Sequence, residues 1–140
     1  MKIYFAGSIR GGREKVDDYK KILKILSGYG IVLTEHIADE KILNEGERHI
    51  TDKEIYERDI AWLDESDVII AEVTITSLGV GYEIGYAESK GKKIICLFHM
   101  TEGCVTRTSA MLSGNKNLTV ITYTTFEELE IQLSKQMRTL

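Results

Sequence analysis

The chain has 140 residues, of which 43% are hydrophobic and 29% are charged, and its formal net charge is −4. The length fits a single domain, residues 1–140, with a proper core, and the negative charge argues against binding to nucleic-acid polymers. No apolar run has the length of a membrane span, no signal peptide is expected, and the two cysteines match no metal-binding motif, so we expect a soluble, cytoplasmic protein.

Short apolar runs alternate with helical patterns along the chain, which is typical of βαβ units and a parallel sheet. The expected strands are residues 2–6, 31–35, 67–73, 93–98 and 118–122. Helical spacing predicts a helix between the first two strands that ends near Gly28 or Gly30. A capping box formed by Thr51 and Glu54 opens a second helix, to about residue 64. Further helices are expected over residues 82–89 and from about residue 125 to the C-terminus, with loops at 37–50 and 99–117.

These elements predict an α/β protein with a Rossmann-like or flavodoxin-like fold. Its five parallel strands would be covered by helices on both faces, in the strand order 2-1-3-4-5. In such sheets ligands bind beyond the carboxyl ends of the strands, where the order reverses. The turns that follow strands 1 and 3 should therefore converge on one site.

The turn after the first strand is rich in glycine and polar residues, and runs from Gly7 through Ser8, Ile9 and Arg10 to Gly12. It lacks the spacing of a P-loop or of a dinucleotide-binding motif. Backbone N–H groups, the Ser8 hydroxyl and the Arg10 guanidinium could nevertheless converge on one phosphate. The alternative is an ordinary strand-to-helix turn with an exposed arginine.

The turn after the third strand holds Ser77, Gly79 and Gly81, and Glu83 follows in the first turn of the next helix. The glycines allow close approach of a ligand, and Glu83 is a candidate catalytic carboxylate. Such a glutamate could instead only complement the helix dipole. Asp59, on the preceding helix, is the second candidate, because a pair of carboxylates can cleave glycosidic bonds with one as nucleophile and one as acid. Asp59 could instead form a surface salt bridge.

Two further side chains are candidates for the same crevice. Tyr4, in the first strand, could hydrogen-bond a catalytic carboxylate, although most strand tyrosines are packing residues. His36, at the end of the second expected strand, could line the site or cap the strand. We assign no metal site, because the histidines and acids have no recognisable metal spacing.

Residues 4–14, 33–36, 59–63 and 71–85 closely resemble the 2'-deoxynucleoside 5'-monophosphate N-glycosidases, which are relatives of the nucleoside 2-deoxyribosyltransferases. The resemblance runs from residue 2 to about residue 114, with its motifs in the same order. It implies hydrolysis of the bond between base and 2-deoxyribose 5-phosphate, without a cofactor. By the family pattern Glu83 would form a covalent glycosyl-enzyme, Asp59 would protonate the departing base, and Tyr4 would orient Glu83.

The resemblance also implies a binding pocket and a homodimer. The residues that would bind the substrate and its phosphate are Gly7, Ser8, Ile9, Arg10, Gly12, His36, Ser77 and Gly79. Ser109, with Met111 two residues on, matches a phosphate-contacting serine that the family supplies from the other subunit. Asp59 must be protonated, or gain a proton on binding, to act as the acid.

Three other functions compete with this interpretation. A nucleoside 2-deoxyribosyltransferase would pass the sugar to another base and would have no use for a phosphate cluster at Ser8, Arg10 and Ser109. A ribonucleotide N-glycosidase, acting for example on cytidine monophosphate, would differ in its contacts to the 2-position of the sugar. A non-catalytic nucleotide sensor would keep its function without Glu83.

Overall fold

The computed structural model describes residues 1–9, 13–39, 49–101 and 107–140. Five parallel strands form one sheet in the order β2-β1-β3-β4-β5, as predicted. The strands are β1 (Lys2–Ala6), β2 (Ile31–Val32), β3 (Val68–Glu72), β4 (Lys93–His99) and β5 (Thr119–Tyr123). The order reverses between β1 and β3, so the turns that follow these two strands leave the same edge of the sheet.

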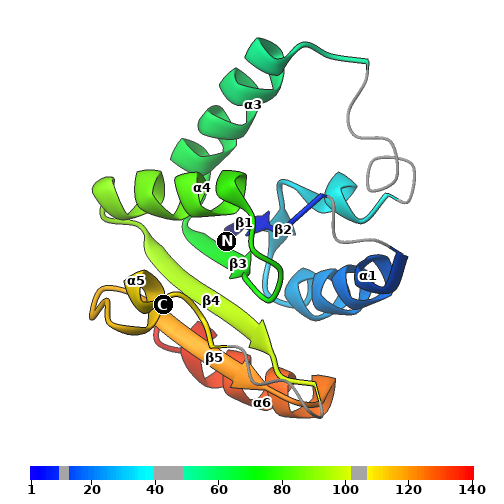
Figure 1. The fold of residues 1–140 in the computed structure, drawn as a ribbon, viewed down its shortest axis with the longest axis vertical. Helices are drawn as coiled ribbons and strands as arrows, with labels where there is room; N and C mark the ends of the chain where they lie inside the picture. The colour runs from blue at the N-terminus through cyan, green and yellow to red at the C-terminus, as the bar shows by residue number, and fades with distance from the viewer. Residues whose placement is uncertain (10–12, 40–48, 102–106) are drawn as a thin grey trace.

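Helices cover both faces of the sheet (Figure 1). On one face lie α1 (Arg13–Ser27) and α6 (Phe126–Met137), and on the other lie α3 (Asp52–Glu65), α4 (Leu78–Ser89) and the short α5 (Ala110–Ser113). The predicted capping box is present at the start of α3, where Thr51 and Glu54 each accept a hydrogen bond from the other's backbone N–H. None of the described helices combines the length and the apolar composition that a membrane span requires.

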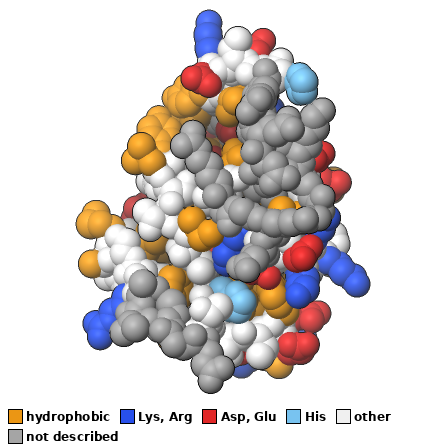
Figure 2. Space-filling view, turned by 45° about the vertical axis from the view of Figure 1, so that its right-hand side comes forward, with side chains coloured by type: hydrophobic (Ala, Val, Ile, Leu, Met, Phe, Trp, Pro, Cys, Tyr) orange, Lys and Arg blue, Asp and Glu red, His pale blue; other side chains and the backbone are white. Residues whose placement is uncertain are grey.

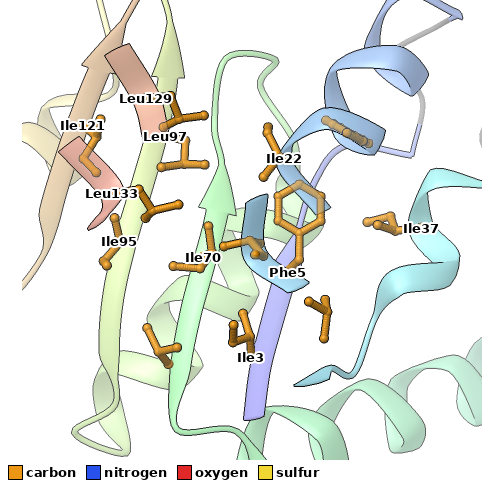
Figure 3. Close-up of a cluster of buried hydrophobic side chains, with 14 of the residues drawn as sticks. Ile3, Phe5, Ile22, Ile37, Ile70, Ile95, Leu97, Ile121, Leu129 and Leu133 are labelled. Atoms are coloured by element: carbon orange, nitrogen blue, oxygen red, sulfur yellow. The ribbon is translucent and has the colours of Figure 1, made fainter. Parts of the chain in front are cut away.

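The core consists of two clusters separated by the sheet. Alternate residues of a strand point to opposite faces, so Ile3 and Phe5 pack under α1 and α6 (Figure 3). Tyr4 and Ala6 belong to the cluster under α3 and α4. The register of β1 therefore places the Tyr4 side chain on the face that α4 covers.

Strand β2 is shorter than predicted because Thr34 takes over the pairing with β1. The buried Thr34 hydroxyl accepts a hydrogen bond from Phe5 N at 2.9 Å and donates one to Phe5 O at 2.7 Å. The chain then leaves the sheet and forms a 3-10 helix, η1 (Glu35–Ala38). The expectation that His36 ends a strand was therefore wrong, since His36 lies in η1.

Helix α4 begins four residues earlier than predicted. The Ser77 side chain caps it by accepting a hydrogen bond from Val80 N at 3.3 Å. Glycine disfavours a helix interior by about 1 kcal/mol per residue, but the cap and the burial of Val80 and Ile84 outweigh the cost of Gly79 and Gly81. A second difference is α5, which lies within the segment 99–117 that was expected to be a loop.

We expect Thr34→Val to lower the free energy of unfolding by about 2 kcal/mol, because it leaves the buried Phe5 N–H and C=O without this partner. The midpoint of urea denaturation measures the loss. The matched control is Thr122→Val on the exposed side of β5, expected within about 0.5 kcal/mol of the wild type. A loss no larger than that of the control would show that Thr34 does not anchor β2.

Candidate active site

A hydrogen bond between a strand and a helix forms the centre of the site. The Tyr4 hydroxyl of β1 donates to Glu83 Oε1 of α4 at 2.8 Å, although the residues are 79 positions apart in the sequence. The contact arises because β1 and β3 are neighbours and α4 follows β3. Tyr4 is buried and points to the face that α4 covers. The structure thus brings together two of the residues singled out in the sequence.

The surroundings of Tyr4 and Glu83 raise the pKa of both side chains. Burial raises the pKa of Glu83 from 4.5 to about 7, with a contribution from the charge of Asp59, while the Tyr4 hydrogen bond acts in the opposite direction. Burial and the two carboxylates also raise the pKa of Tyr4. Tyr4 is therefore a hydrogen-bond donor at any physiological pH, and Glu83 changes its charge near neutrality.

Asp59, in the C-terminal half of α3, is engaged by its sequence neighbour. Arg58 donates to Asp59 Oδ1 from Nε at 2.9 Å and from Nη2 at 2.8 Å. The Arg58 guanidinium also lies over the Trp62 ring, 4.8 Å from its centroid, and the His36 ring lies 5.4 Å from Trp62. In the ligand-free protein Arg58 thus favours the charged form of Asp59.

Arg58 is a residue that the sequence interpretation missed. It lines the same cavity as Tyr4, Asp59 and Glu83. The only available signal was a cation directly before a candidate carboxylate. On a helix, side chains one residue apart usually diverge, so this spacing did not suggest the contact.

Two cavities meet at the carboxylate pair, because Asp59 and Glu83 line both. A cavity of about 270 Å³ opens between α3 and α4 and includes Gly79. Its other walls are mostly apolar: Asp52, Ile55, Tyr56, Ile60, Leu63 and Tyr82. A smaller cavity of about 40 Å³ lies toward β1 and η1, and its lining includes Tyr4, Gly7, Ile9, Thr34, His36 and Arg58.

The first part of the turn after β1, residues 7–9, packs against α1. The Tyr19 hydroxyl donates to the carbonyl of the buried Ser8 at 3.0 Å. A Cβ atom at Gly7 would lie 2.9 Å from the Tyr19 ring, so only glycine fits at this position without displacing the ring. Gly7 and Ile9 line the smaller cavity with the two carboxylates, and Ser8 is buried between them, whereas Arg10 and Gly12 lie outside the described residues.

The remaining candidates lie around a third cavity, of about 400 Å³. Ser77, at the start of α4, and Ser109, which caps α5 by accepting from Met111 N at 3.2 Å, both line it. Ser109 and Met111 line neither of the cavities at Asp59 and Glu83. The Met111 side chain is 80% exposed. Within one chain, therefore, α5 is not brought to the carboxylate pair.

No metal centre is formed by the part of the chain that the structure describes. Its His, Cys, Asp and Glu side chains nowhere form a group of three or more that could hold an ion. The described residues bring two carboxyls, a phenol, a guanidinium and the His36 imidazole to the site. With one carboxyl as nucleophile and the other as acid, such a set suits the cleavage of a glycosidic bond.

Comparison with known proteins gives one consistent result. Residues 3–125 match the nucleoside 2-deoxyribosyltransferase family. The chain is 47% identical over 132 residues to the 5-hydroxymethyl-dUMP N-hydrolase of Danio rerio, covering 94% of this chain and 91% of that protein. It is 51% identical over 118 residues to a putative 2'-deoxynucleoside 5'-phosphate N-hydrolase of Nematostella vectensis, covering 83% and 78% respectively.

Solved structures support the fold assignment. The CMP N-glycosidase of Clostridium botulinum superposes with a TM-score of 0.66 at 22% identity. The match covers 97% of this chain and 99% of that protein. At this identity the likeness concerns the fold alone, and it agrees with the five-stranded parallel sheet described above.

The raised pKa of Glu83 predicts a pH-dependent effect on stability. Because the folded protein holds this proton more tightly than the unfolded chain does, the stabilisation it provides is complete below pH 4.5 and is lost as the pH rises through about 7. We expect the stability gained by Glu83→Gln to grow by about 1–3 kcal/mol between about pH 5 and about pH 8. Chemical denaturation at the two pH values measures it.

The matched control is Glu57→Gln, since the Glu57 side chain on α3 is 61% exposed. Its effect on the free energy of unfolding should not change appreciably with pH over the same range. An equal gain at both pH values for Glu83→Gln would contradict the assignment of a raised pKa to this carboxyl.

Proposed function

The chain belongs to the nucleoside 2-deoxyribosyltransferase family, and from this premise we propose that it hydrolyses the N-glycosidic bond of 2'-deoxynucleoside 5'-monophosphates. The products are the free base and 2-deoxyribose 5-phosphate. The observation that carries the proposal is the partly buried hydrogen bond between Tyr4 and Glu83, beside Asp59 and at the meeting point of two cavities. The names of the relatives from Danio rerio and Nematostella vectensis support the hydrolase over the transferase.

In the first step Glu83 attacks the anomeric carbon and the bond from that carbon to the base breaks. The transition state resembles an oxocarbenium ion, which the Glu83 carboxylate stabilises electrostatically. A 2-deoxy sugar lacks the electron-withdrawing hydroxyl that would oppose this positive charge. The Tyr4 hydroxyl holds one oxygen of Glu83, so the carboxylate is oriented before the substrate arrives.

The departing base requires a proton, which Asp59 supplies. In the second step water attacks the same carbon, Asp59 takes up a proton from the water, and Glu83 is released. The raised pKa of Glu83 means that the carboxyl pair retains a proton near neutral pH. Because Arg58 favours the charged form of Asp59 without ligand, that proton reaches Asp59 only when substrate occupies the site. The chemistry therefore needs neither metal nor cofactor.

The 5'-phosphate distinguishes this substrate from a nucleoside. We assign Gly7, Ser8 and Ile9 to the wall of the sugar and phosphate pocket, together with Arg10 and Gly12 of the same turn. We also assign Ser77 and Gly79, at the N-terminus of α4, to this pocket, where they supply a hydroxyl and backbone N–H groups. His36 lies in the smaller cavity beside Ile9.

We also propose a homodimer in which Ser109 and Met111 serve the partner's site. Support comes from large hydrophobic side chains that are exposed on neighbouring elements, Tyr56, Leu78, Tyr82 and Met111. Figure 2 shows a group of such side chains at the upper left, over α3. Exposure of this kind is typical of interaction surfaces. A cytoplasmic location completes the proposal.

Release of base from deoxynucleoside 5'-monophosphates, including 5-hydroxymethyl-dUMP and dGMP, tests the reaction. We expect Glu83→Gln to lower kcat roughly a thousandfold while nucleotide binding is largely kept, because the nucleophile is lost but the pocket remains. Glu57→Gln, an exposed carboxyl on α3, is the matched control and should keep full activity. Chromatography of the free base measures turnover, and isothermal calorimetry measures binding.

Parallel substrates separate the competing functions. Base exchange on unphosphorylated deoxyguanosine would identify a transferase, and cleavage of GMP or CMP would identify a ribonucleotide hydrolase. Binding of deoxynucleotides without turnover by the wild type would identify a sensor. Each of these outcomes contradicts the proposed reaction.

Mixing two inactive variants tests the shared site. Glu83→Gln removes the nucleophile, and Ser109→Asp keeps a residue suited to cap α5 while it repels a phosphate. In a two-fold dimer, equal mixing restores one complete site in half of the dimers, so activity should return to about a quarter of the wild type. No recovery after subunit exchange would show that each chain has a self-contained site.

A further inference from the structure

A second group of polar side chains, most of them partly buried, lies at the same edge of the sheet as the carboxylate pair, but on the opposite face. Its centre is Glu72, the last residue of β3, which is 2% exposed. Lys15 of α1 lies between two carboxylates, with Nζ 3.7 Å from Glu72 Oε2 and 3.5 Å from Asp18 Oδ2. Neither Lys15 nor Glu72 lines the cavities at Asp59 and Glu83, so the proposed chemistry makes no use of them.

On the α1 side, the ion pair is connected to the turn after β1. Tyr19 follows Lys15 by four residues, which places both side chains on one face of the helix. The Tyr19 hydroxyl donates to Ser8 O, and the Tyr19 ring packs against Gly7. The position of α1 therefore determines the position of this turn.

On the β3 side, the same ion pair is connected to the turn that leads to α4. Glu72 Oε1 accepts a hydrogen bond from Thr74 N at 2.5 Å, and the Thr74 hydroxyl accepts one from His99 N at 2.8 Å. Ser77, three residues after Thr74, caps α4, the helix that carries Glu83. One carboxylate thus contacts α1 through one oxygen and the second turn through the other.

A gain in the stability of the folded protein does not by itself explain the charged side chains around Glu72. Within the described part of the chain, Glu72 Oε2 and His99 Nδ1 face Lys15 and Asp18 only at 3.7 Å, too far for a hydrogen bond, and the neighbouring Tyr123 hydroxyl has no hydrogen-bond partner. Desolvation of a buried ion pair commonly cancels its attraction, and apolar or neutral replacements are often as stable. A different benefit must account for the charges, and the connection to two turns supplies one.

We propose that Lys15 and Glu72 form a positioning pair, which fixes the turn after β1 against the turn after β3 and thereby sets the affinity for the 5'-phosphate end of the substrate. The inference rests on the proposed function, which assigns Ser8 and Ser77 to that end. Because the pair acts through the turns and does not touch the reacting atoms, its loss affects binding much more than bond cleavage.

The double variant Lys15→Met/Glu72→Gln tests the proposal, since it removes both charges and keeps an acceptor for Thr74 N. We expect KM for a deoxynucleoside 5'-monophosphate to rise about tenfold while kcat stays within about threefold. The melting temperature should be equal to or above that of the wild type. The single variant Lys15→Arg retains a cation beside Glu72, and its KM should therefore stay within about threefold of the wild-type value.

The matched control is Lys53→Met/Glu57→Gln, which removes an exposed ion pair of 3.7 Å on α3 and should leave KM unchanged. A lowered melting temperature together with equal losses in kcat and kcat/KM would overturn the proposal, because the pair would then be structural. An unchanged KM would also overturn it.

Amide hydrogen exchange of the ligand-free protein separates this inference from the proposed reaction. In the Lys15→Met/Glu72→Gln variant, exchange should be faster at residues 7–9 and 74–77 and unchanged in α6. If the wild type cleaves no deoxynucleotide, the proposed function fails, but exchange still decides whether the pair positions the turns. Unchanged exchange in both segments would refute the positioning role even if the enzyme is active.

Discussion

The alternation of side chains along β1 is the constraint on which the rest of the structure depends. Phe5 points to one face of the sheet and anchors the core under α1, whereas Tyr4 points to the other and meets Glu83. A shift of one residue in register would exchange the two faces. It would bury no phenol near α4 and would leave the Glu83 carboxyl without its donor. The hydrophobic core and the candidate site are therefore fixed by the same strand pairing.

The two carboxyls of the site have opposite surroundings. Glu83 is largely buried and accepts a hydrogen bond from a phenol that keeps its proton, and burial raises its pKa to about 7. Asp59 has the Arg58 guanidinium on one oxygen, which favours the charged form. A substrate that displaces or reorients Arg58 would remove this preference for the charged form of Asp59. The proton could then move from Glu83 to Asp59, the proposed acid. The difference between the two environments is thus part of the proposed chemistry.

The sequence predicted the fold well because the signals for it are local or periodic. Apolar runs predicted the five strands, the alternation of strands and helices predicted a fold with this strand order, and the capping box at Thr51 predicted the start of α3. The shortened β2 could not be predicted, because it depends on Thr34 bonding to Phe5, 29 residues away. The early start of α4 was missed because glycine suggests a turn, whereas the Ser77 cap and the burial of Val80 outweigh that preference. Arg58 was missed because a contact between adjacent helical residues has no periodic signature.

The separation of 79 positions between Tyr4 and Glu83 also has a consequence for synthesis of the protein. Strand β1 is made first, yet its neighbours β2 and β3 follow later in the chain, and the helix that holds Glu83 comes after β3. Contacts between distant segments form late because the intervening chain must first be ordered. A nascent or partly folded chain therefore has no assembled carboxylate site. The enzyme would thus become active only once β1, β3, α3 and α4 have come together.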